Sequence, residues 1–344
     1  MGKFNNNVKR GVRLFLIILI ITITLLLVFT VSKQTWGAIK RMNFVYLIIA
    51  LVMWFLYVLF DGIRLQIIIH GITGRWINLV TSLEVILTGS FMAAVTPFQT
   101  GGLPVQLYIL YKNKISLGKG TLALLLRGIF YALFIVTLIP FLVPLYRSQV
   151  EEGSMKLLLT YSIIIYSVII IGFFVIILNP RIIKRGLLKI FYRRKKKTKA
   201  VRFIGKTFHE IEEMRREFWR FTSKKGLHSM GAYIFTFLSS IPYYSIAPLI
   251  LYGLGIKAHF FSVFFLQVFL ILFTFFFPTP GGTGAVEGGF AALFATVAPR
   301  YILGIYTLIW RFFTSYITAI IGGFFTLKIL RLGEVDFERE EKNK

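Results

Sequence analysis

Two glycine-rich breaks interrupt long apolar stretches of this chain, and they constrain its fold more than any other feature. The breaks read PFQTGG at 97–102 and PTPGG at 278–282. Lipid offers no hydrogen bonds to an open backbone, so a broken helix at membrane depth must face protein or a water-filled cavity. Each break is followed, roughly thirty residues on, by one arginine inside an apolar segment, Arg127 and Arg311. The repeated arrangement predicts a duplicated core.

The composition indicates an integral membrane protein. Of 344 residues, 56% are hydrophobic and 36 are Phe, and several apolar runs reach the roughly 20 residues that span a bilayer core. The net charge of +26 lies between these runs, which fits cytoplasmic loops beside anionic lipid better than nucleic acid. The chain has no Cys, which excludes disulfides and thiolate chemistry, and its four His show no metal-ligand spacing. We expect no cofactor and no nucleic-acid partner.

The charged loops orient the apolar segments. Eight such segments are found, at 14–31, 44–60, 78–96, 120–144, 156–178, 229–252, 259–277 and 301–327. The first is longer than the hydrophobic core of a signal peptide and is expected to be retained. The loop 181–225 holds 17 Lys or Arg against 4 Glu, so the positive-inside rule places it, with the basic N-terminal tail, in the cytoplasm. We counted the membrane crossings of the chain from these two cytoplasmic segments. On this count both ends of 78–111 lie on the cytoplasmic face, and both ends of 259–297 lie outside the cell.

This count predicts an all-α polytopic membrane protein with six full transmembrane helices and two opposed re-entrant helical hairpins. The first hairpin would use 78–96 and 103–111, and the second 259–277 and 283–297. Inverted repeats with broken helices are a recurring transporter architecture. The chain would be a single domain, 1–344, with cytoplasmic termini; its parts would be a first half at 44–178, the loop 181–225, a second half at 226–330 and a tail at 331–344. Alternatively, both breaks are ordinary kinks in full spans, because Gly and Pro are common there.

The basic loop contains a predicted amphipathic helix. Its apolar positions recur at helical spacing: Val201, Ile204, Phe208, Ile211, Met214 and Phe218. Such a helix could lie on the anionic headgroups of the inner leaflet, which makes 181–225 a candidate lipid-binding segment. A helix packed on the ends of the spans explains the same pattern.

Interior charges are the best candidates for a binding site. Among 14 acidic residues, only Glu84 and Glu287 lie within apolar sequence, one in each predicted hairpin. Arg127 and Arg311 are the matching cations. A lone buried charge costs several kcal/mol and needs a partner, so we expect the arginines to pair with the glutamates or with a bound anion. A guanidinium is well suited to phosphate. Alternatively, these charges only lock helix to helix.

The residues of the two breaks complete the candidate site. Glycines allow close backbone approach, and amides at the following helix N-termini favour anions. The set is Gln99, Thr100, Gly101, Gly102, Gln106, Pro280, Gly281, Gly282, Thr283 and Gly284. Asp61 and Arg64 stand at the expected end of the span 44–60, where they are expected to pair at the membrane interface.

The string FPTPGGTGAVEGGFAALF resembles the hallmark of the lysylphosphatidylglycerol synthase transmembrane region, the flippase-like part of the multiple peptide resistance factor. The segment from PFQTGG to Arg127 resembles the family's earlier motif. On this likeness Gly281, Gly282, Gly284 and Glu287 fall on the second motif, and Arg127 on the first-half arginine. Leu103, Pro104 and Gln106 stand where other members often carry an acidic residue. The resemblance implies a stand-alone flippase-like protein without the soluble synthase domain.

The charges and the resemblance together predict a lipid translocase of the cytoplasmic membrane. It would bind an anionic or aminoacylated phospholipid, or a phosphate-linked glycolipid, by its headgroup between the hairpins. The alternative is a membrane-embedded transferase acting on a polyprenyl-phosphate or phospholipid, which requires a general base or a metal site at an interface. A passive scaffold for a partner enzyme is a third reading. A homodimer is compatible with the sequence.

Overall fold

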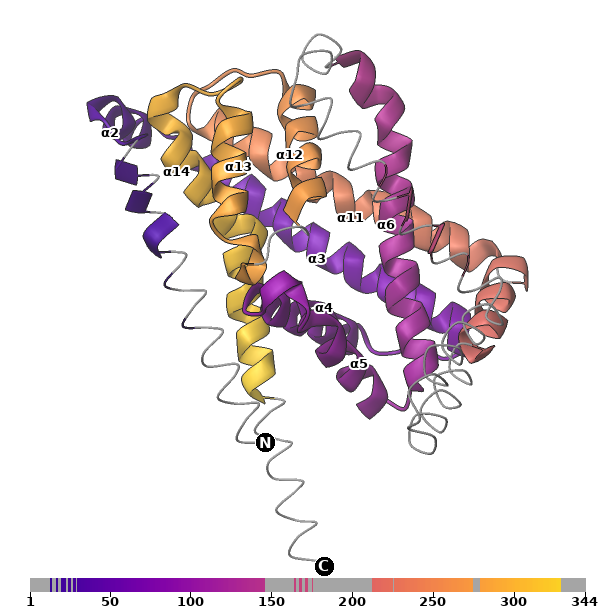
Figure 1. Ribbon diagram of the computed structural model, residues 1–344. Helices are drawn as coiled ribbons and strands as arrows, with labels where there is room; N and C mark the ends of the chain where they lie inside the picture. Colours follow the sequence, from indigo (N-terminus) through magenta and orange to yellow (C-terminus); the bar gives the residue numbers. More distant parts are fainter. Residues whose placement is uncertain are drawn as a thin grey trace, which may run out of the picture. The chain divides into compact units, whose positions relative to one another are not determined.

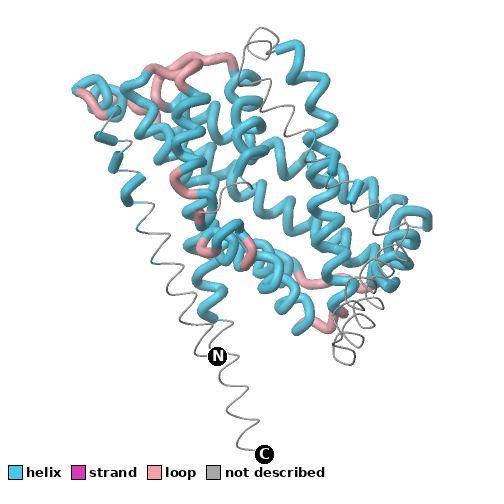
Figure 2. Tube along the Cα trace, in the orientation of Figure 1, coloured by secondary structure: helices cyan, strands magenta, loops and turns pink. Residues whose placement is uncertain are grey.

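The computed structural model describes most of the chain, and the described part consists of helices and turns. The described residues are 30–145, 212–224, 226–274 and 279–328, with the single positions 13, 17, 20–22, 24, 25, 27, 28, 164, 167, 168, 171, 172 and 175. No strand occurs among them (Figures 1 and 2). The chain divides into two compact units. The first unit comprises 1–62, 80–106 and 238–344, and the second unit comprises 63–79 and 107–237.

Four described helices are long and apolar enough to cross a membrane. They are Phe44–Thr73, Leu117–Leu138, Gly226–Gly253 and Arg300–Lys328. Each coincides with one of the six expected full spans, and the other two, 14–31 and 156–178, lie partly outside the described residues. The prediction of a helical, multi-pass membrane protein is therefore confirmed.

Helix α3 (Phe44–Thr73) is longer than its sequence pattern predicts. The expected span ended near 60, where Asp61 and Arg64 interrupt the apolar run. In the structure both residues lie inside the helix and are buried, with 0% and 5% of their surface exposed. The expected helix end near 60 is wrong, because charged side chains that are buried in protein do not have to end a helix at the water interface. Arg64 Nη1 donates a hydrogen bond to Thr236 Oγ1 at 3.3 Å within the second unit.

The first helix break separates α4 (Leu79–Ala94), the short 3-10 helix η1 (Pro97–Gln99) and α5 (Gly102–Lys112). Phe98 and Gln99 both adopt left-handed backbone conformations, with φ of 51° and 58°, which few residues other than Gly tolerate. The hydroxyl of Thr96 closes the turn, since it accepts a hydrogen bond from the Gly101 N–H at 2.9 Å. This break therefore ends one helix and starts another.

The two arms of this first break pack closely. A Cβ added to Gly102 would lie 3.0 Å from the carbonyl oxygen of Gly89, and one added to Gly89 would overlap the Gln106 side chain. The start of α5 thus lies against α4, and Pro104 occupies its first turn, where a missing N–H costs nothing.

The second break repeats this arrangement. It separates α12 (Phe260–Thr274), η3 (Pro280–Gly282) and α13 (Ala285–Phe294), and α12 packs against α13. Gly281, Gly282 and Gly284 have φ of 60°, 69° and 93°, conformations that glycine adopts without strain. η1 and η3 lie against each other, and a Cβ on Gly281 would stand 3.1 Å from the carbonyl oxygen of Ala94. The tips of the two broken helices therefore meet within the first unit.

The last described span follows the second break. It consists of α14 (Arg300–Arg311), a π-helical turn η4 (Phe312–Tyr316) and further helix to Lys328. The short helix α2 (Lys33–Lys40) is tied to its start, because the Thr35 hydroxyl donates a hydrogen bond to the Tyr301 carbonyl. Helix α11 (Gly226–Gly253) contains Pro242 and Pro248. Only its part from Leu238 onward belongs to the first unit.

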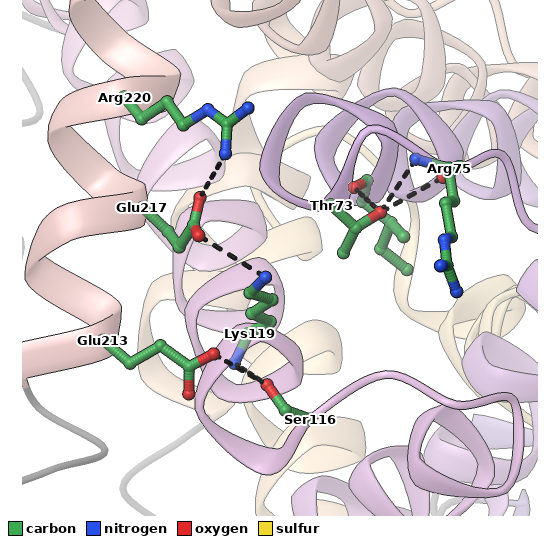
Figure 3. A network of polar contacts seen from close by, with 8 residues as sticks. Thr73, Arg75, Ser116, Lys119, Glu213, Glu217 and Arg220 are labelled. Atoms are coloured by element: carbon green, nitrogen blue, oxygen red, sulfur yellow. Dashed lines mark hydrogen bonds and ion pairs between the residues drawn. The ribbon is translucent and has the colours of Figure 1, made fainter.

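In the second unit, a helix over 212–219, continued by the π-helical turn η2 (Arg220–Lys224), lies beside the start of α6 (Leu117–Leu145). Figure 3 shows the polar contacts: Glu217 pairs with Lys119 at 3.4 Å, and the Ser116 hydroxyl donates to Glu213 at 3.1 Å. Met214 and Phe218 are buried. This part of the basic loop therefore packs on protein, as the second reading of the amphipathic helix expects. Residues 181–211 of the loop lie outside the described residues.

Candidate binding site at the second helix break

A buried ion pair joins α13 to α14 beside the second break. Nε of Arg311 donates a hydrogen bond to Oε1 of Glu287 at 2.7 Å, and only 7% and 1% of the two side chains are exposed. Nη1 of Arg311 donates a second bond to the hydroxyl of Ser315, one helical turn later, at 2.9 Å. Taking two charges out of water is costly unless each finds partners. The pairing of Arg311 with Glu287 fits one of the partnerships that the interior charges predicted.

Glu287 also caps the helix on which it stands. Its second carboxylate oxygen, Oε2, accepts a hydrogen bond from the Gly284 N–H at 2.7 Å. Glu287 occupies the third position of α13, where a negative charge favours the positive end of the helix dipole. Gly284 has φ of 93°, so glycine is needed at the cap. The spacing of glycine and glutamate in GTGAVE thus follows from the geometry of one helix start.

The carboxylate divides its two oxygens between different donors, and this leaves part of the guanidinium open. Arginine has five N–H groups and often pairs with both oxygens of a carboxylate. Here Glu287 takes only the Nε edge of Arg311, and Ser315 takes one hydrogen of Nη1. Nη2 forms no hydrogen bond with any described residue. An anion could use the Nη1–Nη2 edge without breaking the ion pair.

Aromatic side chains of α13 and α14 stack beside the pair. The guanidinium carbon of Arg311 lies 5.8 Å from the Trp310 ring. Trp310 stacks on Phe290 of α13 at 4.3 Å, and Phe290 stacks on Phe294 at 3.9 Å. The indole N–H of Trp310 is buried and has no hydrogen-bond partner among the described residues. The stack fixes α13 against α14, so the arginine is held in place by packing as well as by charge.

Two tyrosines stand near the guanidinium, and a third contacts one of them. Tyr243 of α11 and Tyr316 of η4 lie close enough to interact electrostatically with Arg311. The rings of Tyr243 and Tyr57, from α3, are 4.8 Å apart. Among the described residues, the site thus combines the guanidinium of Arg311 and the carboxylate of Glu287 with the phenols of Tyr243 and Tyr316.

The residues of the two breaks are engaged mainly within their own turns. Thr283 is buried and its hydroxyl donates to the Pro280 carbonyl at 2.8 Å. Thr100 is exposed, and its hydroxyl donates to the Pro97 carbonyl at 3.0 Å. Gln99 is half-buried and is hydrogen-bonded through its side chain to no described residue. The glycine pairs and Pro280 shape the contact between the tips, while Gln106 packs on α4.

The other two predicted interior charges stand on α6 and α4. Arg127 is half-buried on α6 in the second unit. Glu84 is half-buried on α4 in the first unit, and no described residue forms an ion pair or hydrogen bond with it. Of the four interior charges, the structure therefore brings two into direct contact. Any role of Arg127 and Glu84 in binding stays a prediction.

Sequence reasoning missed several polar side chains that the structure brings together. Ser315 was detectable, because it stands four residues after Arg311 and so on the same face of the helix. Tyr243 stands in an interruption of the expected span 229–252 that could line a cavity, but a proline kink at Pro242 with aromatic packing is the preferred interpretation of the sequence. Gln267 gave no signal, since single polar residues in apolar segments are common. In the second unit, His70 and His228 form a 2.8 Å hydrogen bond between their ring nitrogens, and His70 stacks on Trp76. The distance of 158 residues between the two histidines hides this pair in the sequence.

The fold and the site define a multi-pass helical membrane protein in which two broken helices meet beside a buried Arg–Glu pair. The family model described as the lysylphosphatidylglycerol synthase TM region matches residues 14–322, and the chain belongs to this family. A relative, a UPF0104 membrane protein of Archaeoglobus fulgidus, is 24% identical over 302 residues, which cover 86% of this chain and 89% of the relative. No solved structure matches.

Proposed function

We propose that this protein is a lipid translocase of the cytoplasmic membrane that binds the phosphate of a lipid headgroup at Arg311. The observation that carries this proposal is that the described hydrogen bonds of the Arg311 guanidinium use Nε and Nη1 only. Glu287 holds its Nε edge in a buried setting, while Nη2 has no described partner. In a low-dielectric site, a charge-assisted hydrogen bond to phosphate is stronger than its counterpart in water.

The junction of the tips supports a transport role. Broken helices that meet near mid-depth are typical of transporters, and their backbone can be satisfied there by ligand or water. η1 and η3 lie against each other, and in this proposal they are the tips of two re-entrant hairpins entering from opposite leaflets. Six full spans and cytoplasmic termini complete the topology. The glycine turns would offer backbone amides to the headgroup.

The family description supports lipid as the substrate class, because it names a derivative of phosphatidylglycerol, a phosphodiester lipid. The transported lipid would be an anionic or aminoacylated phospholipid, or a phosphate-linked glycolipid. Arg127 is a second candidate for phosphate binding. The basic loop 181–225 would contact anionic headgroups of the inner leaflet.

Reconstitution into liposomes with headgroup-labelled phospholipids tests this proposal. The Arg311→Ala variant is expected to move phospholipid at least about tenfold more slowly than the wild type, since a hydrogen bond to a charged group contributes about 1.5–3 kcal/mol. Arg300→Ala is the matched control, because Arg300 is an exposed arginine on the same helix. Arg311→Lys keeps the charge and tests the guanidinium geometry. Wild-type protein that moves no phospholipid above empty liposomes, or an Arg311→Ala rate equal to the Arg300→Ala rate, contradicts the proposal.

A further inference from the structure

Tyr243 is a further polar group near Arg311, and it lies between two prolines of α11. Pro242 precedes it and Pro248 follows within α11. A proline inside a helix removes one backbone hydrogen bond and bends the helix. The Tyr243 side chain is half-buried, and its hydroxyl is hydrogen-bonded to no described residue.

Hydrogen bonds on both sides of Arg311 join its span to α11, which carries Tyr243, and to α3, which carries Tyr57. The Tyr306 hydroxyl, five residues before Arg311, donates to the carbonyl of Ala247, one turn after Tyr243, at 2.9 Å. Seven residues after Arg311, the Thr318 hydroxyl accepts from the indole N–H of Trp54 at 2.8 Å. Helices α11 and α3 therefore flank the turns of the span that carry Arg311. The Tyr243–Tyr57 ring contact joins these two helices.

A buried glutamine fixes the backbone at Tyr243. Gln267 of α12 is completely buried, and its Nε2 donates to the Tyr243 carbonyl at 3.2 Å. Its Oε1 accepts from the Ala247 N–H at 3.3 Å. These are the carbonyl and amide that a regular helix would join to each other. A buried amide with both ends engaged is costly to move, so Gln267 sets the position from which the Tyr243 ring projects.

We infer that Tyr243 contacts the lipid headgroup: its hydroxyl donates a hydrogen bond to the same phosphate that Arg311 binds, and Gln267 is its positioning residue. This inference rests on the proposed function. A phosphodiester has two non-bridging oxygens, so one can accept from the Arg311 Nη edge and the other from the phenol. The site then selects lipids with a phosphate at the glycerol over neutral lipids with the same acyl chains.

The test compares two labelled lipids, phosphatidylglycerol and diacylglycerol, in binding and translocation by the full chain in liposomes. Tyr243→Phe removes one hydroxyl and is expected to weaken phosphatidylglycerol binding about three- to tenfold, the size of one hydrogen bond, without changing diacylglycerol. Tyr252→Phe is the matched control on the same helix, since that hydroxyl donates to the Ala258 carbonyl at 3.0 Å beyond the end of α11. Gln267→Leu is expected to give a similar loss, and the double variant no further loss.

The outcomes distinguish a failure of the Tyr243 contact from a failure of the proposed lipid translocation. Wild-type protein that handles no lipid, or Arg311→Ala behaving as wild type, overturns the translocase proposal itself. If Arg311→Ala loses phosphatidylglycerol but Tyr243→Phe matches Tyr252→Phe, the role of Tyr243 is wrong and the proposed function stands. An equal loss of both lipids in Tyr243→Phe also overturns the contact, because it indicates disturbed packing. Additive losses in the double variant contradict positioning by Gln267.

Discussion

At the scale of single residues, one carboxylate performs two structural tasks. Glu287 caps α13 through the Gly284 amide and holds Arg311 through its other oxygen. The sequence marked both charged residues, because a charge inside an apolar run stands out. The sequence could not predict which carboxylate oxygen of Glu287 binds which donor, since this depends on how α14 packs against α13. Tyr243 lies 68 residues from Arg311, and only the folded chain brings them together.

The buried ion pair predicts different effects for the substitution of Glu287 alone and of Glu287 together with Arg311. Glu287→Leu leaves Arg311 buried without its partner and should destabilise the protein by about 3–5 kcal/mol, whereas Glu287→Leu with Arg311→Leu should regain most of that stability. Thermal unfolding of the purified protein measures both. Phospholipid translocation should remain lost in the double variant. If the double variant transports at the wild-type rate, the pair only locks helix to helix.

At the scale of elements, the sequence located the breaks well and the helix ends less well. Pro and Gly in PFQTGG and PTPGG predicted where α4 ends and where α5 and α13 begin, because their backbone preferences are local. The length of α3 was missed, since Asp61 and Arg64 lower hydropathy but are buried in protein. The contact between η1 and η3 was expected from transporter architecture and not from any pattern in either segment.

A glycine in the last span predicts how tightly the elements pack. A Cβ on Gly322 would lie 2.0 Å from the carbonyl oxygen of Leu87, a backbone atom of α4 that cannot rotate away. Gly322→Ala should therefore lower stability by about 1–3 kcal/mol, the usual effect of overpacking. Gly37→Ala is the control, because a Cβ on that helical glycine meets no atom within 4 Å. The midpoints of thermal unfolding of the two variants measure this effect. Equal midpoints would contradict the close packing of the last span against α4.

At the scale of the whole molecule, the compact units do not follow the predicted repeat halves. The first unit takes α4 from one half and α12 to α14 from the other. Both helix breaks thus belong to one body, as the two broken segments of an inverted repeat would if they build a shared site. The topology could be predicted from the charge of the loops, because the orientation of a span on membrane insertion depends on the Lys and Arg residues near its ends. Packing between the halves has no such signature in a single sequence.

The orientation of the hairpins is accessible through cysteine labelling, since the chain has no Cys. Arg300→Cys and Lys328→Cys bracket one candidate span and should react with an impermeant maleimide from opposite faces of the membrane, Arg300→Cys from outside. Lys114→Cys, in the turn after α5, should react from the same side as Lys328→Cys. If 78–111 and 259–297 were both kinked full spans instead, the chain would cross at each of them, and Lys114→Cys would react from outside with Arg300→Cys. The basic loop 181–225 would then also face outward, against the positive-inside rule, so the side on which Lys114→Cys reacts decides between a re-entrant hairpin and a full span.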